Sequence, residues 1–579
     1  MFSTASQKGF SLKAWRGSSM TLLAMNFKKK PAKNFAGFSI AYINPKGNKY
    51  YLKNLINFEG SNEVTSTFIS PIQLFRWVHF PGSYQQRGIL TGEYTYMATP
   101  RFIDEKKKLA KIDRSQTVSV KVTVGDFKKG GLTIGFTRAF LKSQAFAKKY
   151  GSKQKLKPTG GDWIFNTNDV AGSRNKNDFT YENMYSWLGF SAREMILQTL
   201  ASALSDQNLS IDMFAYDFND PVIASLCLQL AERGSIRIIL DNAALHSGPK
   251  AEEDDFEKRF NEVATGSAAI FRCHFARYSH CKVIIVKKDQ KPVSVLCGST
   301  SFSYTGLLIN ANHVLLFEHK GAAEYFGEVF DACWQNGKAP PFRISEFATN
   351  TKQFNMPLLP TTELNFSPHS KTDASQLIDE ITANVTAPGT RSVIFSVMEM
   401  GPKTTGSLLP ALRQLHKNDK IYSYGITDNS GDEISIYKPG LKNGLLINAK
   451  AARRELPPPF QKEANLGLAH AIHHKFVVTN FNKRNARVYC GSSNLALGGE
   501  TDNGDNLICI KDSDVATAFT IEAIRLTDHY NFRSLQDRKG ANRAAGKPAS
   551  AIKLDRSGKW FNRFYDPNDI RCIERKLFA

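Results

Sequence analysis

The chain has 579 residues, 42% of them hydrophobic and 22% charged, and 76 Lys and Arg against 53 Asp and Glu give it a formal net charge of +23. The length predicts two to four domains, and the lack of any CxxC pair excludes a zinc ribbon. No run reaches the roughly 18 apolar residues that span a bilayer, and no classical signal peptide is visible. We therefore expect a cytoplasmic protein, with export as an effector by a route without a cleaved signal left open.

Residues 1–150 form the first predicted domain, a mostly β and strongly basic one. They hold 25 Lys and Arg against 7 Asp and Glu. Residues 115–124 (SQTVSVKVTV) alternate apolar and polar side chains, as a half-buried strand does, and 35–43 and 92–99 look similar. Turn residues separate these runs, which favours a β-sandwich. A positive electrostatic field concentrated on one domain is suited to binding a polyanionic partner.

From residue 151 to 365 the pattern changes to alternating helices and strands. Helices are predicted over 192–206 and 220–234, and strands over 209–218 and 235–242. Short connections between such elements predict a parallel or mixed sheet covered by helices.

Residues 366–579 repeat this order. A helix over 375–385, a strand over 390–400, a helix over 406–418 and a strand over 420–427 follow one another. Such a duplication predicts a pseudo-twofold pair of α/β lobes.

Each half then carries the same short motif at the head of an apolar strand. The first half reads HCKVIIV from His280, and the second reads HHKFVVT from His473, 193 residues later. In both halves a Gly-Ser pair follows, with the serine 17 residues after the lysine, and Asn312 or Asp505 comes 13 residues after that serine.

Two His-Lys pairs suit phosphodiester chemistry. One imidazole can attack phosphorus while the other protonates the leaving oxygen. Lysines supply fixed positive charge for the phosphoryl oxygens, and Ser and Asn side chains can donate to the same atoms. A carboxylate beside one imidazole would raise its pKa and set its tautomer.

The doubled HxK…GSxN pattern resembles the phospholipase D superfamily over roughly residues 160–579. The resemblance implies two α/β/α sandwich lobes with one active site at their interface, a covalent phosphohistidine intermediate, and neither cofactor nor metal. Residues that match the two motifs, or stand at their positions, are His280, Lys282, Ser299, Ser301, Asn312, His473, Lys475, Ser492, Asn494 and Asp505.

The match is uneven. Ser301 replaces the asparagine of the family motif in the first half, and Asn312 replaces its acidic residue. The aspartate usual five residues after the lysine is absent from both halves, where Lys287 and Asn480 stand; Asp289 is a candidate substitute.

This asymmetry suggests roles. We expect Asp505 to keep His473 protonated as the general acid, and His280, without a carboxylate, to stay neutral as the nucleophile. In two-lobed members of the superfamily the N-terminal histidine is commonly the nucleophile, which agrees.

The motifs do not separate the superfamily's substrates. The basic first domain favours a nuclease on DNA or RNA, with nucleic acid as the partner. A phospholipase D whose first domain docks on an anionic membrane surface is the alternative, and a nucleic-acid-binding scaffold with a decayed site is the third. DNA or RNA, strandedness, oligomeric state and biological role stay open.

Overall fold

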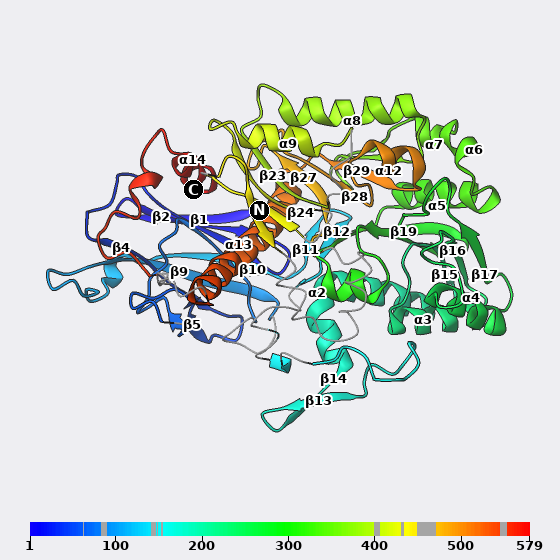
Figure 1. The fold of residues 1–579 in the computed structure, drawn as a ribbon, viewed down its shortest axis with the longest axis horizontal. Helices are drawn as coiled ribbons and strands as arrows, with labels where there is room; N and C mark the ends of the chain where they lie inside the picture. Colours follow the sequence, from blue (N-terminus) through cyan, green and yellow to red (C-terminus); the bar gives the residue numbers. More distant parts are fainter. Residues whose placement is uncertain are drawn as a thin grey trace.

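A computed structural model of the chain describes all residues except 62, 83–89, 140–145, 147–148, 152–153, 399–405, 430–432, 440, 449–470 and 545–552. Figure 1 shows the N-terminal strands in blue beside the long helix α13 (Ser513–Ala544), with the second lobe in yellow and orange and the first lobe in green. The two lobes and the N-terminal β region confirm the predicted fold class.

The N-terminal region is a sandwich of two antiparallel sheets. The first has the order β1 (Phe2–Gln7), β2 (Phe10–Arg16), β3 (Thr21–Phe27), β8 (Arg76–His79), and the second β10 (Val118–Val124), β9 (Gly92–Phe102), β4 (Phe35–Ile43), β5 (Lys49–Tyr51). In β10 every second side chain is buried, as the valine alternation predicts. The aromatic and aliphatic side chains between the sheets form one core that includes Phe10, Phe38, Tyr94 and Tyr96.

Lobe 1 is built on an eight-stranded mixed sheet. Its order is β11 (Phe127–Lys129), β12 (Leu132–Phe136), β20 (His313–Phe317), β19 (Lys291–Gly298), β18 (Val283–Lys288), β15 (Leu209–Ala215), β16 (Ile236–Asp241), β17 (Ala269–Cys273). Strands β11 and β12 come from the first 150 residues, so part of that stretch contributes to lobe 1. The predicted division into domains stays a proposal.

Helices cover both faces of this sheet. One core contains side chains of α2 (Tyr181–Ser205), α3 (Pro221–Glu232) and α4 (Glu252–Val263), and the other contains those of α5 (Lys320–Gln335). Helix α3 begins where the sequence predicts, because Asp220 accepts hydrogen bonds from the N–H groups of Val222 and Ile223, and Pro221 occupies the first turn.

Lobe 2 repeats this topology. Its nine-stranded sheet has the order β21 (Lys352–Phe354), β22 (Thr362–Phe366), β29 (Asn506–Ile510), β28 (Arg487–Gly491), β27 (Lys475–Thr479), β23 (Ser392–Met398), β24 (Tyr422–Asn429), β25 (Glu433–Tyr437), β26 (Leu445–Asn448). Strands β29, β28, β27, β23 and β24 stand in the order of β20, β19, β18, β15 and β16, with the same parallel and antiparallel pairings. Helices α8 (Lys371–Thr386), α9 (Leu409–His416), α12 (Leu497–Asp502) and α13 belong to this lobe, and α13 packs on its sheet.

The end of the chain joins the N-terminal sandwich to lobe 2. Arg76 of β8 forms ion pairs with Asp528 of α13 (2.7 Å) and Glu574 of α14 (Ile570–Phe578; 2.5 Å), and the Trp15 indole N–H donates to the Phe578 carbonyl. No helix in the described part of the chain is long and apolar enough to cross a bilayer.

Candidate active site

The two HxK motifs occupy equivalent positions at the heads of β18 and β27. His280 and Lys282 are 6% and 1% exposed, and His473 and Lys475 are 9% and 0% exposed. Residues two apart in extended chain share a face, which brings each lysine beside its histidine. Each ammonium group donates back to the carbonyl of that histidine, at 2.8 Å for Lys475.

The lobes meet through two short backbone bridges that are related by the pseudo-twofold. Tyr278, two residues before His280, pairs with Asn503, two residues before Asp505. Ala311 pairs with Ile472, and the His473 N–H donates to the Ala311 carbonyl at 3.1 Å. Each bridge places the HxK histidine of one lobe against the residue 13 positions after the Gly-Ser serine of the other lobe, Asn312 or Asp505.

His280 therefore has Asp505 as its partner, with Nδ1 2.7 Å from Oδ1. Burial lowers the pKa of His280 to about 4, although Asp505 opposes this shift, and Lys282 adds to it. Burial raises the pKa of Asp505, but His280 and Lys282 outweigh burial and lower it to about 2. At neutral pH an ionised Asp505 thus accepts the Nδ1–H of a neutral His280, which leaves Nε2 with its lone pair.

His473 has Asn312 as its partner instead. Its Nδ1 lies 2.9 Å from Asn312 Oδ1 and 3.2 Å from the Ser299 carbonyl oxygen. The expectation that Asp505 accompanies His473 is therefore wrong. Asp505 and His473 belong to the same lobe, but the bridges between the lobes exchange the partners.

The serines of the Gly-Ser pairs hold these partners in place. Ser299 Oγ donates to Asn312 Oδ1 at 2.8 Å, and Ser492 Oγ accepts the N–H of Asn506, the neighbour of Asp505, at 2.9 Å. A Cβ at Gly298 (φ +150°) would lie 2.3 Å from the His313 carbonyl oxygen. A side chain cannot fit at that approach, which explains the glycine.

Ser301 and Asn494 lie in the turns after these serines, at equivalent positions of the two lobes. Both are buried, at 3% and 5% exposure. The Oδ1 atom of Asn494 has no hydrogen-bond partner among the described residues. A buried amide with an unused polar atom can turn toward a ligand oxygen.

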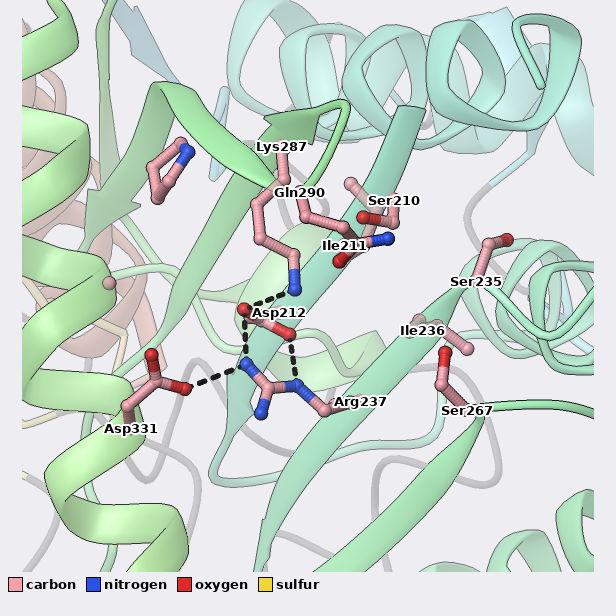
Figure 2. Close-up of a pocket in the computed structure, with 12 residues that line it drawn as sticks. Ser210, Ile211, Asp212, Ser235, Ile236, Arg237, Ser267, Lys287, Gln290 and Asp331 are labelled. Atoms are coloured by element: carbon pink, nitrogen blue, oxygen red, sulfur yellow. Dashed lines mark hydrogen bonds and ion pairs between the residues drawn. The ribbon is translucent and has the colours of Figure 1, made fainter. Parts of the chain in front are cut away.

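Lys287 and Asn480, which stand where the family motif has aspartates, each have a polar partner. Lys287 forms an ion pair with Asp212 (2.8 Å), and Arg237 bonds the same carboxylate at 2.7 Å. Figure 2 shows this cluster in a pocket of about 310 Å³. Asp289 is exposed in the turn that follows β18, and the carboxylate that pairs with Lys287 is that of Asp212 in β15. In lobe 2, Asn480 accepts the Arg391 N–H at 2.9 Å.

Sequence reasoning missed several residues of the site. The Tyr216 ring stands edge-on to His280, with 4.6 Å between ring centroids, and the Lys282 ammonium lies 4.3 Å from its centroid. His474, at the variable position of HxK, lies with Nδ1 3.2 Å from His313 Nδ1 and Nε2 3.2 Å from Glu522. Tyr216 follows β15 directly, so the end of that predicted strand was the one available signal.

A family model described as "Cardiolipin synthase, PLD-like domain" matches residues 196–334, which is most of lobe 1 with its HxK strand and Gly-Ser turn. Residues 196–334 of this chain are a phospholipase D-like domain. The matched segment contains five of the ten predicted site residues, and lobe 2 repeats its topology. No curated protein matches the chain.

Solved structures of phospholipase D-like and other proteins resemble the chain at low sequence identity and low TM-score. Nuc from Salmonella typhimurium, a phospholipase D family member, is 26% identical over 25% of this chain and 89% of its own, with a TM-score of 0.21. Phosphatidylserine synthase from Haemophilus influenzae Rd KW20 is 11% identical over 67% and 91% (TM-score 0.38). Polyphosphate kinase from Porphyromonas gingivalis is 12% identical over 68% of this chain and only 54% of its own (TM-score 0.36). These likenesses carry no inference about the substrate.

Proposed function

We propose that this phospholipase D-like protein is a phosphodiesterase that acts through a phosphohistidine, and that its substrate is a nucleic acid. The supporting observation is the reciprocal arrangement at the lobe interface, where two buried His-Lys pairs each receive an oriented partner from the other lobe. A site that had lost its activity would not need both Asp505 and Asn312 in these positions.

In the first step, His280 Nε2 attacks phosphorus, and the bond from phosphorus to the leaving oxygen breaks. Asp505 accepts the Nδ1–H and stabilises the positive charge that forms on the ring. His473 gives its proton to the leaving oxygen, with Asn312 orienting its ring. In the second step His473 takes a proton from water, the resulting hydroxide attacks phosphorus, and the nitrogen–phosphorus bond breaks to restore His280.

The two lysines supply the positive charge that the phosphoryl oxygens need. Burial lowers the pKa of Lys282 to about 8, with Asp505 opposing. Burial and the neighbouring Lys282 lower the pKa of Lys475 well below its usual value. A bound phosphodiester brings a negative charge that favours the protonated form of both lysines.

The nucleic-acid substrate is supported by the charge of residues 1–150. Lysines 28–30 and 106–108 are exposed on the N-terminal sandwich, where they can pair with backbone phosphates. A phospholipid substrate is the second candidate, because the matched family model is described as that of a cardiolipin synthase.

The test is hydrolysis in excess EDTA of labelled plasmid, single-stranded DNA and RNA, beside liposomes of phosphatidylcholine and of phosphatidylglycerol. We expect cleavage of nucleic acid that is lost in His280→Ala and in His473→Ala. His274→Ala is the matched control, because that histidine is exposed and only six residues from His280. Turnover of lipid alone would replace the substrate assignment, and hydrolysis that survives in both variants would overturn the mechanism.

A further inference from the structure

A second group of polar side chains lies beside the active site in lobe 1. Asp217 follows β15, His246 follows β16, and Glu253 stands in the first turn of α4. The carboxyl ends of the parallel strands β15 and β16 meet at one edge of the sheet, which brings these three segments together. One potential ligand atom of each residue lies within 4.8 Å of the other two.

The histidine of this group is oriented as metal-binding histidines are. His246 is 5% exposed, and its Nδ1 lies 2.7 Å from Asp241 Oδ2. Asp241 is itself held by the N–H groups of Ser279 (2.5 Å) and Ala243 (3.0 Å), which fixes it as the acceptor. This pairing leaves His246 Nε2 available as a ligand, in the carboxylate–histidine arrangement that supports bound metals.

The two carboxylates are also positioned from outside the group. Ser303 Oγ donates to Asp217 Oδ2 at 2.6 Å, and the Phe218 N–H donates to Glu253 Oε1 at 2.9 Å. Each carboxylate is thus anchored through one oxygen. Glu253 is 3% exposed, so its carboxylate is held out of water close to that of Asp217. A cation bound between two carboxylates this close would offset their repulsion.

We propose that Asp217, His246 and Glu253 bind a divalent first-row metal ion such as Zn²⁺. One imidazole nitrogen and two carboxylate oxygens form a three-ligand set that leaves positions open for water or substrate. Asp217 is partly exposed, which provides a path for the ion. The hydrolytic steps proposed above do not use this metal, so the site goes beyond that function.

The proposed metal site lies close to the nucleophilic half of the active site. The Tyr216 ring stands edge-on to both His246 and His280, at 4.6 Å from each ring centroid. Asp241, which orients His246, also accepts the N–H of Ser279, the residue before His280. An ion at this site would add stability to the segments around His280, whose own contact with Asp505 does not depend on it.

The experiment uses the full chain, stripped with EDTA, dialysed, and loaded with Zn²⁺ or with Mg²⁺. We expect about one Zn²⁺ per chain by elemental analysis and a rise in Tm on Zn²⁺ addition, with a much weaker response to Mg²⁺. Glu253→Gln and His246→Ala should abolish both responses, and Asp241→Asn should weaken Zn²⁺ affinity by about 10- to 100-fold.

Glu252→Gln is the matched control, since it removes the same charge from the same turn of α4 without touching the group. Glu253→Gln keeps an oxygen for the Phe218 N–H, and circular dichroism checks that it folds. His280→Ala should retain Zn²⁺, which separates this site from the proposed reaction. A chain that binds no Zn²⁺, or binds it equally well as Glu253→Gln, would overturn the proposal and leave Asp217 and Glu253 as a pair that shares a proton.

Discussion

The two halves of the active site have the same backbone and different partners. His280 faces a carboxylate, Asp505, whereas His473 faces an amide, Asn312. A carboxylate stabilises the imidazolium that a nucleophilic histidine becomes, while a neutral amide orients a ring without holding its proton. The difference teaches that the duplicated fold supplies the geometry and that one side chain in each half assigns the role.

The residues packed behind the two histidines also differ. Behind His473, the rings of His313 and His474 stack, and His474 reaches Glu522 of α13, which pairs with Arg525. At the equivalent place behind His280, the Asn506 amide lies 3.5 Å from the Cys281 sulfur. The His473 side is thus backed by a charged, buried network that continues into α13.

The largest expected effect comes from removing either histidine. We predict that His280→Ala and His473→Ala each lower kcat by a factor on the order of 10⁴ to 10⁶, as for other paired catalytic groups. The two should differ with a p-nitrophenyl phosphodiester, whose leaving group needs no proton. His473→Ala should then accumulate phosphoenzyme, whereas His280→Ala should form none. Mass spectrometry that locates the phosphate on His473 would reverse the roles.

The next largest effect is expected when both histidines are given the same kind of partner. Asp505→Asn gives both histidines an amide partner, and we predict a loss in kcat of about 10²- to 10⁴-fold with little change in KM, because the imidazolium loses its counter-charge. Asn312→Asp gives both a carboxylate, which favours the protonated form of His473, so the alkaline limb on which the general acid loses its proton should move to higher pH. Equal activity of Asp505→Asn and the parent would show that the carboxylate has no role.

The sequence was sufficient for the elements and for the two half-sites, but not for how the halves combine. Valine alternation and helix periodicity depend on local patterns, and the predicted strands at 209–218 and 390–400 are β15 and β23. The contact of His280 with Asp505 joins residues 225 positions apart. It depends on the bridge between Tyr278 and Asn503, which no local pattern encodes. Alignment of the repeats instead suggested a partner in the same lobe.

The pH dependence of kcat/KM should reflect the same asymmetry. Because the pKa of His280 is about 4, its lone pair is available above pH 4, and the rate should fall about tenfold per pH unit below it. Because the pKa of Lys282 is about 8, the positive charge for the phosphoryl group is lost as pH rises through 8. Stopped-flow assays from pH 3.5 to 9.5 measure both limbs, and a Lys282→Arg variant, whose guanidinium stays charged, should lose the part of the upper limb that Lys282 contributes.

The low pKa of His280 also makes folding sensitive to acid. The unfolded chain binds a proton to this histidine below about pH 6.5 and the folded chain does so only below about 4, so its contribution is complete above 6.5 and lost as pH falls toward 4. Urea unfolding across this range should therefore show a smaller loss of stability in His280→Gln than in the parent. An identical pH slope in both chains would contradict a buried, neutral His280.

The smallest expected effect concerns the network behind His473 and is one of stability. Glu522→Gln removes the charge that pairs with Arg525, and we predict a loss of about 3 kcal/mol in the free energy of unfolding, because a buried guanidinium would lose its counter-ion. Asp289→Asn is the control on an exposed turn and should change stability by less than about 0.5 kcal/mol. If Glu522→Gln also lowers kcat while His474 keeps its position, the buried network influences the general acid His473. The half-site whose histidine has an amide partner would then depend on the carboxylate of Glu522, which lies behind His474.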